Sequence, residues 1–143
     1  MWKIKKFEEL TTDELFEILR LRVSIFVVEQ ERIYQEVDEV DKHAIHIFNW
    51  EDGRVIAYAR VFKENDVAVF GRVGVKKSLR GNGLANELME KIFDVLNSEF
   101  KNDKVKIIAQ TEVQRFYEKW GFTVIGEPYI HEHTPHIDMQ LVK

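Results

Sequence analysis

The chain has 143 residues, of which 45% are hydrophobic and 32% charged, the balance of a folded globular protein rather than a disordered one. It contains no cysteine, which excludes disulfides, thiolate nucleophiles and cysteine-based zinc sites. A net charge of −4 argues against a role on nucleic acid or acidic membranes, and without a signal peptide or an apolar run of ~20 residues we expect a cytoplasmic protein.

The N-terminal half is predicted to form a strand, a helix and a three-stranded meander. Thr11 and Glu14 stand three residues apart and predict a capping box, after which apolar residues recur at helical spacing to about Val28. Asp52-Gly53 predicts a tight hairpin, because both residues of such a turn take positive φ. The strands are expected at residues 3–7, 45–50, 55–62 and 67–75, with a turn at 63–66 before the last of them.

The C-terminal half is predicted to alternate helices and strands. An amphipathic pattern predicts a long helix over residues 83–100, and the apolar run 105–109 is typical of a strand buried on both faces. Thr111 and Gln114 predict a second capping box, which opens a short helix that Gly121 ends. The two remaining strands are expected at residues 122–126 and 137–142.

These elements describe one α/β domain over residues 1–143, in which α and β are mixed and a largely antiparallel sheet is flanked by helices. The expected order is strand, helix, three strands, helix, strand, helix, two strands. No linker, repeat or low-complexity stretch marks a domain boundary.

A basic, glycine-bearing loop joins the strand at 67–75 to the helix at 83–100. The backbone N–H groups at a helix start have no intrahelical partner, and the helix dipole makes that end positive. Lys76, Lys77 and Arg80 add positive charge there. The predicted ligand is a pyrophosphate, and a plain strand–helix turn is the alternative. The loop has neither the P-loop pattern nor the G-x-G-x-x-G of a dinucleotide fold.

The stretch Arg80-Gly81-Asn82-Gly83-Leu84-Ala85 resembles the R/Q-x-x-G-x-G/A pyrophosphate loop of the GNAT superfamily of acyl-CoA-dependent N-acyltransferases. Residues 116–122 are similar to the family's Y-x-x-x-G-F segment, and residues 21–30, 34–38 and 135–139 resemble its ElaA-like branch. The resemblance implies a GNAT fold and contacts to coenzyme A from Val73, Gly74, Val75, Arg80, Gly81, Asn82, Gly83, Leu84, Ala85, Gln110 and Phe116.

The resemblance also implies a reaction. An acetyl or short acyl group would pass from acetyl-CoA, as co-substrate, to a primary amine by direct attack in a ternary complex. Tyr117 would be the general acid that protonates the departing thiolate, although its helical spacing alone favours a core position. Many members carry a carboxylate base on the fourth strand, and this chain has none there. The substitutes are Glu36, Asp38, His43 and His46, acting directly or through water.

Several alternatives stay open. The acidic segment 29–41 would attract a cationic amine, or it is an ordinary solvated loop. The acceptor is expected to be a small-molecule or peptide amine and the protein a monomer or homodimer. A zinc site at His131, His133 and His136 is not expected, because Thr134-Pro135 redirects the chain between them. The competing functions are a non-catalytic module that binds or senses acyl-CoA, and an acyltransferase with another acyl donor.

Overall fold

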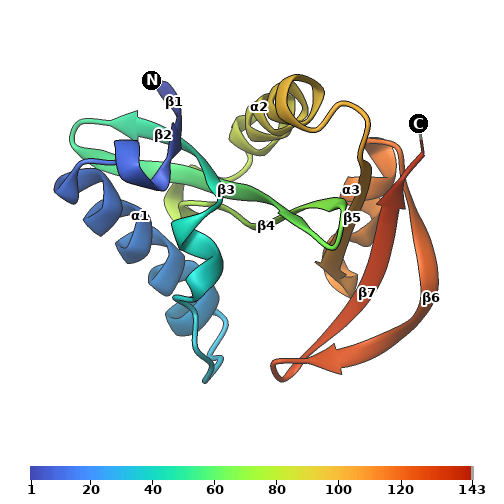
Figure 1. Cartoon of the computed structure of the whole chain (residues 1–143). Helices are drawn as coiled ribbons and strands as arrows, with labels where there is room; N and C mark the ends of the chain where they lie inside the picture. The colour runs from blue at the N-terminus through green and yellow to red at the C-terminus, as the bar shows by residue number, and fades with distance from the viewer. Residues whose placement is uncertain (143) are drawn as a thin grey trace.

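The computed structural model describes residues 1–142, and these form a seven-stranded sheet with helices on its faces (Figure 1). The predicted order of strands and helices is confirmed. The strands are β1 Trp2–Lys6, β2 Ile45–Glu51, β3 Arg54–Glu64, β4 Val67–Val75, β5 Lys104–Gln110, β6 Phe122–His131 and β7 Thr134–Leu141, and the helices are α1 Thr12–Val23, α2 Leu84–Glu99 and α3 Gln114–Lys119.

The strand order in the sheet is β1-β2-β3-β4-β5-β7-β6. Every neighbouring pair is antiparallel except β4 and β5, which run parallel. Helix α1 lies on one side of the N-terminal strands and α2 on the other (Figure 1). The predicted mixed α/β fold with a largely antiparallel sheet is therefore confirmed.

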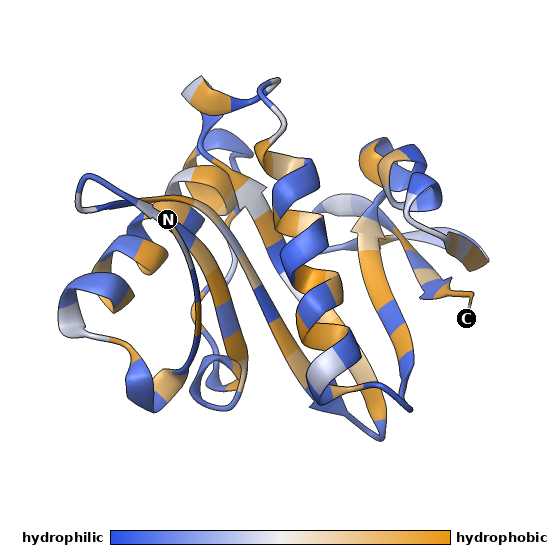
Figure 2. Cartoon of the chain, turned by 90° about the horizontal axis from the view of Figure 1, so that it is seen from above, coloured by the Kyte–Doolittle hydropathy of each residue, from blue (hydrophilic) through white to orange (hydrophobic). Residues whose placement is uncertain are grey.

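The hydrophobic core is divided between the two faces of the sheet. The larger cluster lies under α2, whose Leu88, Met89 and Ile92 are fully buried at helical spacing. Figure 2 shows the alternation of hydrophobic and hydrophilic residues along this helix. The smaller cluster joins α1 to the opposite face of β2 and β3 through residues such as Ile18 and Phe48. The two clusters hold the N-terminal strands between two helices.

Helix α1 begins with the predicted capping box. The Thr11 hydroxyl accepts a hydrogen bond from the Glu14 N–H (3.0 Å), and the Glu14 carboxylate accepts one from the Thr11 N–H (2.9 Å). After Val23 the chain continues in a π-helical segment, η2 Ser24–Glu29. The predicted helix to about Val28 is thus present, but its last turn is widened, a feature that often marks functional sites.

Glu14 also accepts hydrogen bonds from Lys3 (2.8 Å) and Lys5 (2.9 Å) on β1. Burial alone would raise the pKa of this carboxyl, but the two lysines and the Thr11 N–H lower it from 4.5 to about 2. A carboxyl with a lowered folded-state pKa stabilises the fold above pH 4.5 and loses that contribution as the pH falls towards 2.

We therefore expect Glu14→Gln to lower the free energy of unfolding by about 3 kcal/mol at pH 7, because each unit of the pKa lowering from 4.5 to about 2 represents ~1.4 kcal/mol. Urea unfolding at pH 7 and pH 3 measures it, and the deficit should shrink at the lower pH. Glu90→Gln, on the exposed face of α2, is the matched control and should change stability by less than ~0.5 kcal/mol. A deficit independent of pH would contradict this account.

Both predicted turns of the meander are present, and the turn between β3 and β4 is shorter than predicted. Asp52 and Gly53 take φ values of 49° and 75°, so the predicted turn between β2 and β3 is confirmed. The turn between β3 and β4 is confined to Asn65 and Asp66, both with positive φ, because the strands extend through Glu64 and resume at Val67.

Two predictions in the C-terminal half are wrong. Strand β5 is buried on one face only: its side chains alternate between buried and exposed, and Ile108 is 52% exposed. The second capping box does not form, because Thr111–Val113 is a 3₁₀ turn and α3 begins at Gln114 without a side-chain cap. Gly121, with φ of 94°, follows α3 as predicted, and β6 and β7 are longer than expected.

Candidate active site

The sheet opens between its two central strands. Strands β4 and β5 pair only over Val67–Val69 and Lys104–Lys106, although β4 runs on to Val75 and β5 to Gln110. Within residues 1–142, the β5-facing edge of β4 therefore has no strand partner over residues 70–75. Backbone N–H and C=O groups along such an edge are free to bind an extended ligand.

A β-bulge lies in the same part of β4. One residue of β3, Ala59, lies opposite two of β4, Arg72 and Val73, and Arg72 takes φ of 52°. A bulge bends its strand and redirects the side chain at that point. Here it directs the Arg72 side chain to Glu36, with which it forms an ion pair.

Gly74 has a packing role in this strand. A Cβ at this position would lie 2.8 Å from the Ile25 side chain and 3.3 Å from that of Phe26. Both residues belong to η2, so the glycine allows the π-helical segment to approach the backbone of β4 closely. The predicted contact from Val73, Gly74 and Val75 to coenzyme A thus falls on a strand that η2 covers from one side.

The loop after β4 leads directly into α2. Gly81 and Gly83 both take φ of 85°, and a Cβ at either would meet no atom within 4 Å. Leu84 and Ala85 pack their side chains against the core. The backbone N–H groups of residues 81–86 donate to no acceptor within residues 1–142. Together with the dipole of a 16-residue helix, they form a site suited to an anion.

Arg80 is paired within the protein. Its Nη1 and Nη2 donate to the two carboxylate oxygens of Glu29 (2.6 and 2.8 Å), and its Nε donates to the Val75 carbonyl (3.0 Å). The hydrogen bond from Arg80 lowers the pKa of Glu29. The guanidinium thus ties the loop to η2, and Asn82 adds a bond to the Leu79 carbonyl (3.2 Å).

Tyr117 lies on α3 and is 8% exposed. Its ring packs against Phe70 of β4, Phe116 and Phe122, with centroid separations of 5.3–6.1 Å. Burial raises the pKa of the phenol, so it stays protonated at neutral pH. The hydroxyl has no hydrogen-bond partner within residues 1–142, and it is not sealed from solvent. A fixed ring with a free, protonated hydroxyl has the properties of a proton donor.

Gln110 ends β5 on the other side of the opening. Its Nε2 donates to the Gln30 side-chain oxygen (2.9 Å), which links the end of β5 to the segment after η2. Phe116 is partly buried and packs on the main core beside Tyr117. The strand edge, the loop and the residues on α3 and β5 thus come from separate parts of the sequence and border the same opening in the sheet.

Six charged side chains near the bulge form one ion-pair network, which we call the arginine–carboxylate network. Glu36 pairs with Arg22 (2.7 Å) and with Arg72. The network was not predicted, although Arg22 stands four residues from Ile18 and from Phe26 in the apolar row of the first helix, which signals a buried position. Its members are Arg22, Arg60, Arg72, Glu36, Asp38 and Asp41.

The network contains two of the predicted bases. Glu36 is buried, and its carboxylate is held by two arginines. The Asp38 carboxylate is 34% exposed and pairs with Arg60 (2.6 Å). Burial alone would raise the pKa of Asp38, but the hydrogen bond and charge of Arg60 lower it. Of the two carboxylates, Asp38 is the one that solvent reaches.

The predicted bases among the histidines have other surroundings. His46 is fully buried, with Nε2 at 2.8 Å from the Asp41 carbonyl and Nδ1 at 2.6 Å from the Tyr58 hydroxyl. A carbonyl only accepts, so Nε2 carries the proton. Burial lowers the pKa of the ring, so Nδ1 accepts from Tyr58 and both nitrogens are occupied. His43 is exposed and lies beside Phe62 and Phe100, near the C-terminal end of α2 and far from the loop.

The acidic segment 29–41 is not a free negative surface. Glu29, Glu36, Asp38 and Asp41 are all paired with arginines, and Glu39 pairs with Lys42 (3.1 Å). Because most of its carboxylates are neutralised by basic side chains, this segment would attract a cationic amine only weakly.

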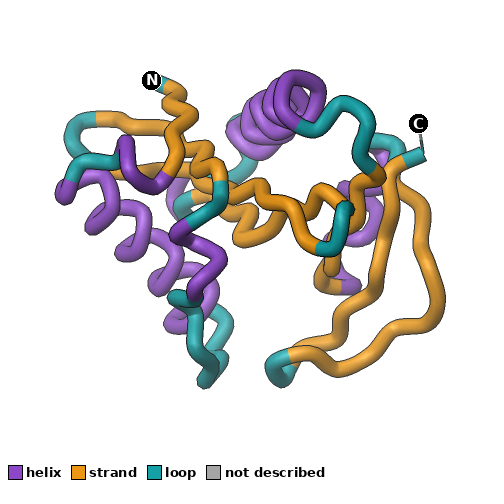
Figure 3. The backbone as a smooth tube through the Cα atoms, in the orientation of Figure 1, coloured by secondary structure: helices purple, strands orange, loops and turns teal. Residues whose placement is uncertain are grey.

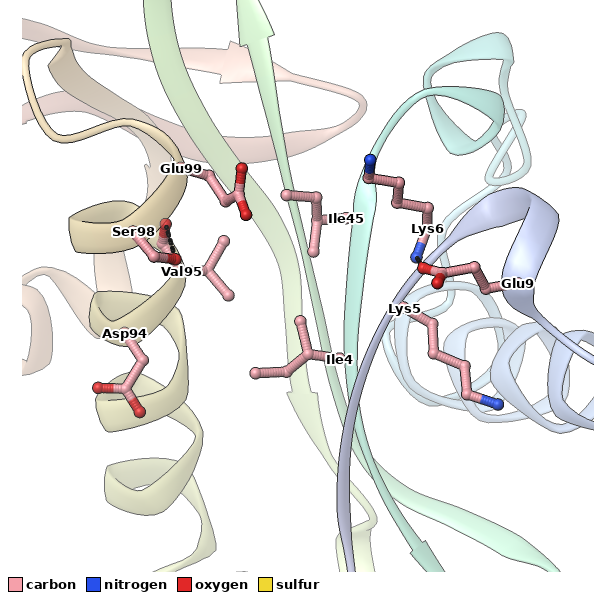
Figure 4. Close-up of a pocket in the computed structure, with 9 residues that line it drawn as sticks. All are labelled: Ile4, Lys5, Lys6, Glu9, Ile45, Asp94, Val95, Ser98 and Glu99. Atoms are coloured by element: carbon pink, nitrogen blue, oxygen red, sulfur yellow. Dashed lines mark hydrogen bonds between the residues drawn. The ribbon is translucent and has the colours of Figure 1, made fainter.

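A hollow of about 190 Å³ lies away from this site, between β1 and the C-terminal half of α2 (Figure 4). Ile4, Ile45 and Val95 line it together with charged side chains, and none of the predicted site residues borders it. Within residues 1–142 no group of three or more histidine or acidic side chains is placed to hold a metal ion. No helix in the same range is long and apolar enough to cross a membrane.

Comparison with known proteins places this arrangement in a family. The family model described as acetyltransferase (GNAT) domain matches residues 14–143. Protein ElaA of Escherichia coli (strain K12) is 35% identical over 143 residues, covering 96% of this chain and 94% of its own. The UPF0039 protein sll0451 of Synechocystis sp. is 33% identical, covering 96% of this chain and 92% of its own.

Two solved structures are similar to this chain in fold, with the same TM-score. The crystal structure of an acyl-CoA N-acyltransferase from Pseudomonas aeruginosa has a TM-score of 0.94 at 35% identity, and that of Escherichia coli ElaA has a TM-score of 0.94 at 34% identity. Each comparison covers 99% of both chains. The predicted resemblance is confirmed, and the chain belongs to the GNAT acetyltransferase family, in which it is similar to ElaA.

Proposed function

We propose that this protein transfers an acetyl or short acyl group from coenzyme A to a primary amine by direct attack in a ternary complex. The observation that carries the proposal is the unpaired edge of β4 over residues 70–75, which leads into a loop of free N–H groups at the start of α2. The Pseudomonas aeruginosa relative, described as an acyl-CoA N-acyltransferase, supports the same donor.

The proposed donor site has two parts. The pyrophosphate of acetyl-CoA binds the N–H groups of residues 81–86, where the helix dipole is positive and two glycines leave the backbone uncovered. The amide-bearing arm of the donor is an extended chain, and the free edge at Val73–Val75 offers it complementary hydrogen bonds. Gln110 and Phe116 border the opening on its other side.

The proposed reaction needs two proton transfers. The amine nitrogen attacks the thioester carbon, a tetrahedral adduct forms, and the carbon–sulfur bond breaks to release the amide. Tyr117 gives its proton to the departing thiolate. The proton lost by the amine passes to Asp38 through water, since Asp38 is the predicted carboxylate base that solvent reaches. The contacts of Glu36 and His46 give them structural roles, and the exposed His43 lies far from the loop.

Gly83→Ala tests the donor site. A side chain at φ of 85° is strained, and its Cβ would cover the backbone that the pyrophosphate approaches. We expect the affinity for acetyl-CoA to fall about tenfold or more, as measured by calorimetry or by the rise in Tm with ligand. In the unsubstituted protein, ligand at 100 times Kd should stabilise the fold by ~2.7 kcal/mol.

Gly53→Ala is the matched control. Gly53 has φ of 75° and a Cβ there would also meet no atom within 4 Å, but this glycine lies in the β2–β3 turn. The variant should show the same cost in stability and unchanged binding of acetyl-CoA. Equal binding losses in both variants would remove the loop from the donor site. Release of free thiol with a panel of amines then tests the reaction, and binding without turnover of any amine would favour the non-catalytic module.

A further inference from the structure

Arg32 is a buried arginine with an unusual set of partners. It is 7% exposed and lies in the segment after η2. Its Nε donates to the Glu132 carbonyl in the β6–β7 turn (2.9 Å), and its Nη1 lies 3.4 Å from the Gln30 side-chain oxygen. Its guanidinium carbon is 4.5 Å from the centre of the Tyr34 ring. All of these partners are neutral groups.

The charges of the other buried arginines are compensated, although the buried Nε of Arg60 has no hydrogen-bond partner within residues 1–142. Arg22 and Arg60 each contact two carboxylates, and in the arginine–carboxylate network three guanidiniums face three carboxylates. Arg32 lies next to this network, because the Tyr34 ring that it contacts is also 5.5 Å from the Arg72 guanidinium carbon. Within residues 1–142, no carboxylate lies within 4 Å of Arg32. The region therefore has one positive charge without a counterion.

Burial of such a charge is costly unless an anion compensates it. Hydrogen bonds to a carbonyl and an amide offset part of this cost, but not the net charge. The Nη2 of Arg32 donates to no protein acceptor within residues 1–142 and is not sealed from solvent. It thus presents a free donor on a preoriented guanidinium, which is the geometry that binds carboxylates.

The position of Arg32 connects it to the proposed reaction. Gln30, which accepts from Arg32, also accepts from Gln110 at the end of β5, while Tyr34 connects Arg32 to Arg72 on the bulge of β4. Arg32 is therefore linked, through one intermediate side chain each, to both strands whose separation opens the sheet. In Figure 3 the loop that carries it and the β6–β7 turn lie at the same end of the molecule.

Nearby titratable groups do not supply the missing charge. His136 pairs with Gln110 in the β5–β7 ladder and lies close enough to Arg32 to interact with it. Burial lowers its pKa, so the ring is neutral at pH 7. Tyr34 stays protonated, because burial raises its pKa. Glu31 and Glu132, the nearest carboxylates in sequence to Arg32 and to the carbonyl that it binds, form no ion pair with it within residues 1–142. The exposed Nη2 is therefore open to an anion from solution.

We propose that Arg32 binds a carboxylate of the acceptor, so that the acceptor is an amine that also carries a carboxylate, such as a free amino acid. This inference rests on the proposed acyl transfer and names the substrate class. The proposed acceptor is a zwitterion, whereas the sequence suggested a plain cationic amine. The acidic segment 29–41 is already paired with basic residues and would not specifically attract such a zwitterion. Arg32 would bind the acceptor and determine its specificity, while the groups that border the opening between β4 and β5 would carry out the acyl transfer.

The test is a set of matched acceptors. L-Amino acids and their carboxamides share a side chain and differ in the anionic group, and release of free thiol from acetyl-CoA measures kcat/KM for each pair. Each value is corrected for the fraction of free amine, because the α-amine of the carboxamide has the lower pKa. We expect at least one acid to exceed its amide tenfold or more. Arg32→Gln should bring that ratio close to one, mainly through KM, and leave the reaction of the amide nearly unchanged. An equal rise in Tm with acetyl-CoA in both proteins would show that the variant is folded.

Arg54→Gln is the matched control, because it removes the same charge from an exposed position in the β2–β3 hairpin and should keep the preference. Equal use of acids and amides, or a preference that survives in Arg32→Gln, would overturn the proposal.

A second measurement separates the site from the reaction. N-acetylated amino acids and their amides are titrated against the protein with coenzyme A, and the NMR signal of the Arg32 Nε–H group is followed. A shift with the carboxylates alone, without turnover of any amine, would support the carboxylate site while the proposed function failed. No shift with any carboxylate would overturn the site itself.

Discussion

Replacement of Tyr117 by phenylalanine is expected to lower kcat about 100-fold and to leave the affinity for acetyl-CoA within about twofold. The ring is held by Phe70, Phe116 and Phe122, and its hydroxyl makes no hydrogen bond within residues 1–142. Phenylalanine therefore preserves the packing and removes only the proton donor. Thiol release gives kcat, and calorimetry gives the binding constant.

The raised pKa of Tyr117 fixes the expected pH profile. Because burial shifts the pKa above its ordinary value of 10, the phenol stays protonated throughout the usual assay range, and activity should not fall on the alkaline side below about pH 10. It should rise with pH as the amine loses its proton. Acyl donors with more acidic thiols need less protonation, so the defect of Tyr117→Phe should shrink with them. An unchanged kcat would assign Tyr117 to the core alone.

The features that sequence predicts well are those that a short segment determines. The Thr11 and Glu14 capping box, the Asp52-Gly53 turn and the loop at residues 80–85 depend on neighbouring residues, whose conformations the backbone itself restricts. The strand order beyond the meander and the opening between β4 and β5 depend on contacts over long sequence distances, and no local pattern specifies them.

The candidate bases illustrate the same limit. Glu36, Asp38 and His46 are chemically able to accept a proton, and sequence alone does not tell which contacts they make. Their partners come from other elements: Arg22 is on α1, and Arg60 and Tyr58 are on β3. The sequence identifies residues whose type allows them to accept a proton. Whether such a side chain is free to do so depends on the contacts that the fold gives it.

The same dependence makes Asp41 a residue whose substitution should strongly destabilise the protein. Its carboxylate accepts from Arg22 Nη1 and Nη2 (2.7 and 3.1 Å) and from Arg60 Nη1 (2.9 Å), and all three residues are buried. Asp41→Asn leaves two buried guanidiniums without one of their counterions. Removal of one partner from a buried ion pair costs about 3–5 kcal/mol, so Tm should fall by about 10 °C or more.

The pH dependence distinguishes lost charge from altered shape. Burial alone would raise the pKa of Asp41, but the hydrogen bonds and charges of Arg22 and Arg60 lower it below 3.8. The stabilisation is thus complete above pH 4 and is lost at lower pH, so the deficit of Asp41→Asn in urea unfolding should narrow below pH 4. Glu39→Gln, two residues away and 85% exposed, removes a charge from a surface pair and should cost less than ~1 kcal/mol. If the loss of unfolding free energy in Asp41→Asn were the same at pH 3, the asparagine side chain would destabilise the protein through its packing and not through the missing charge. The network would then contribute to stability by packing rather than by charge.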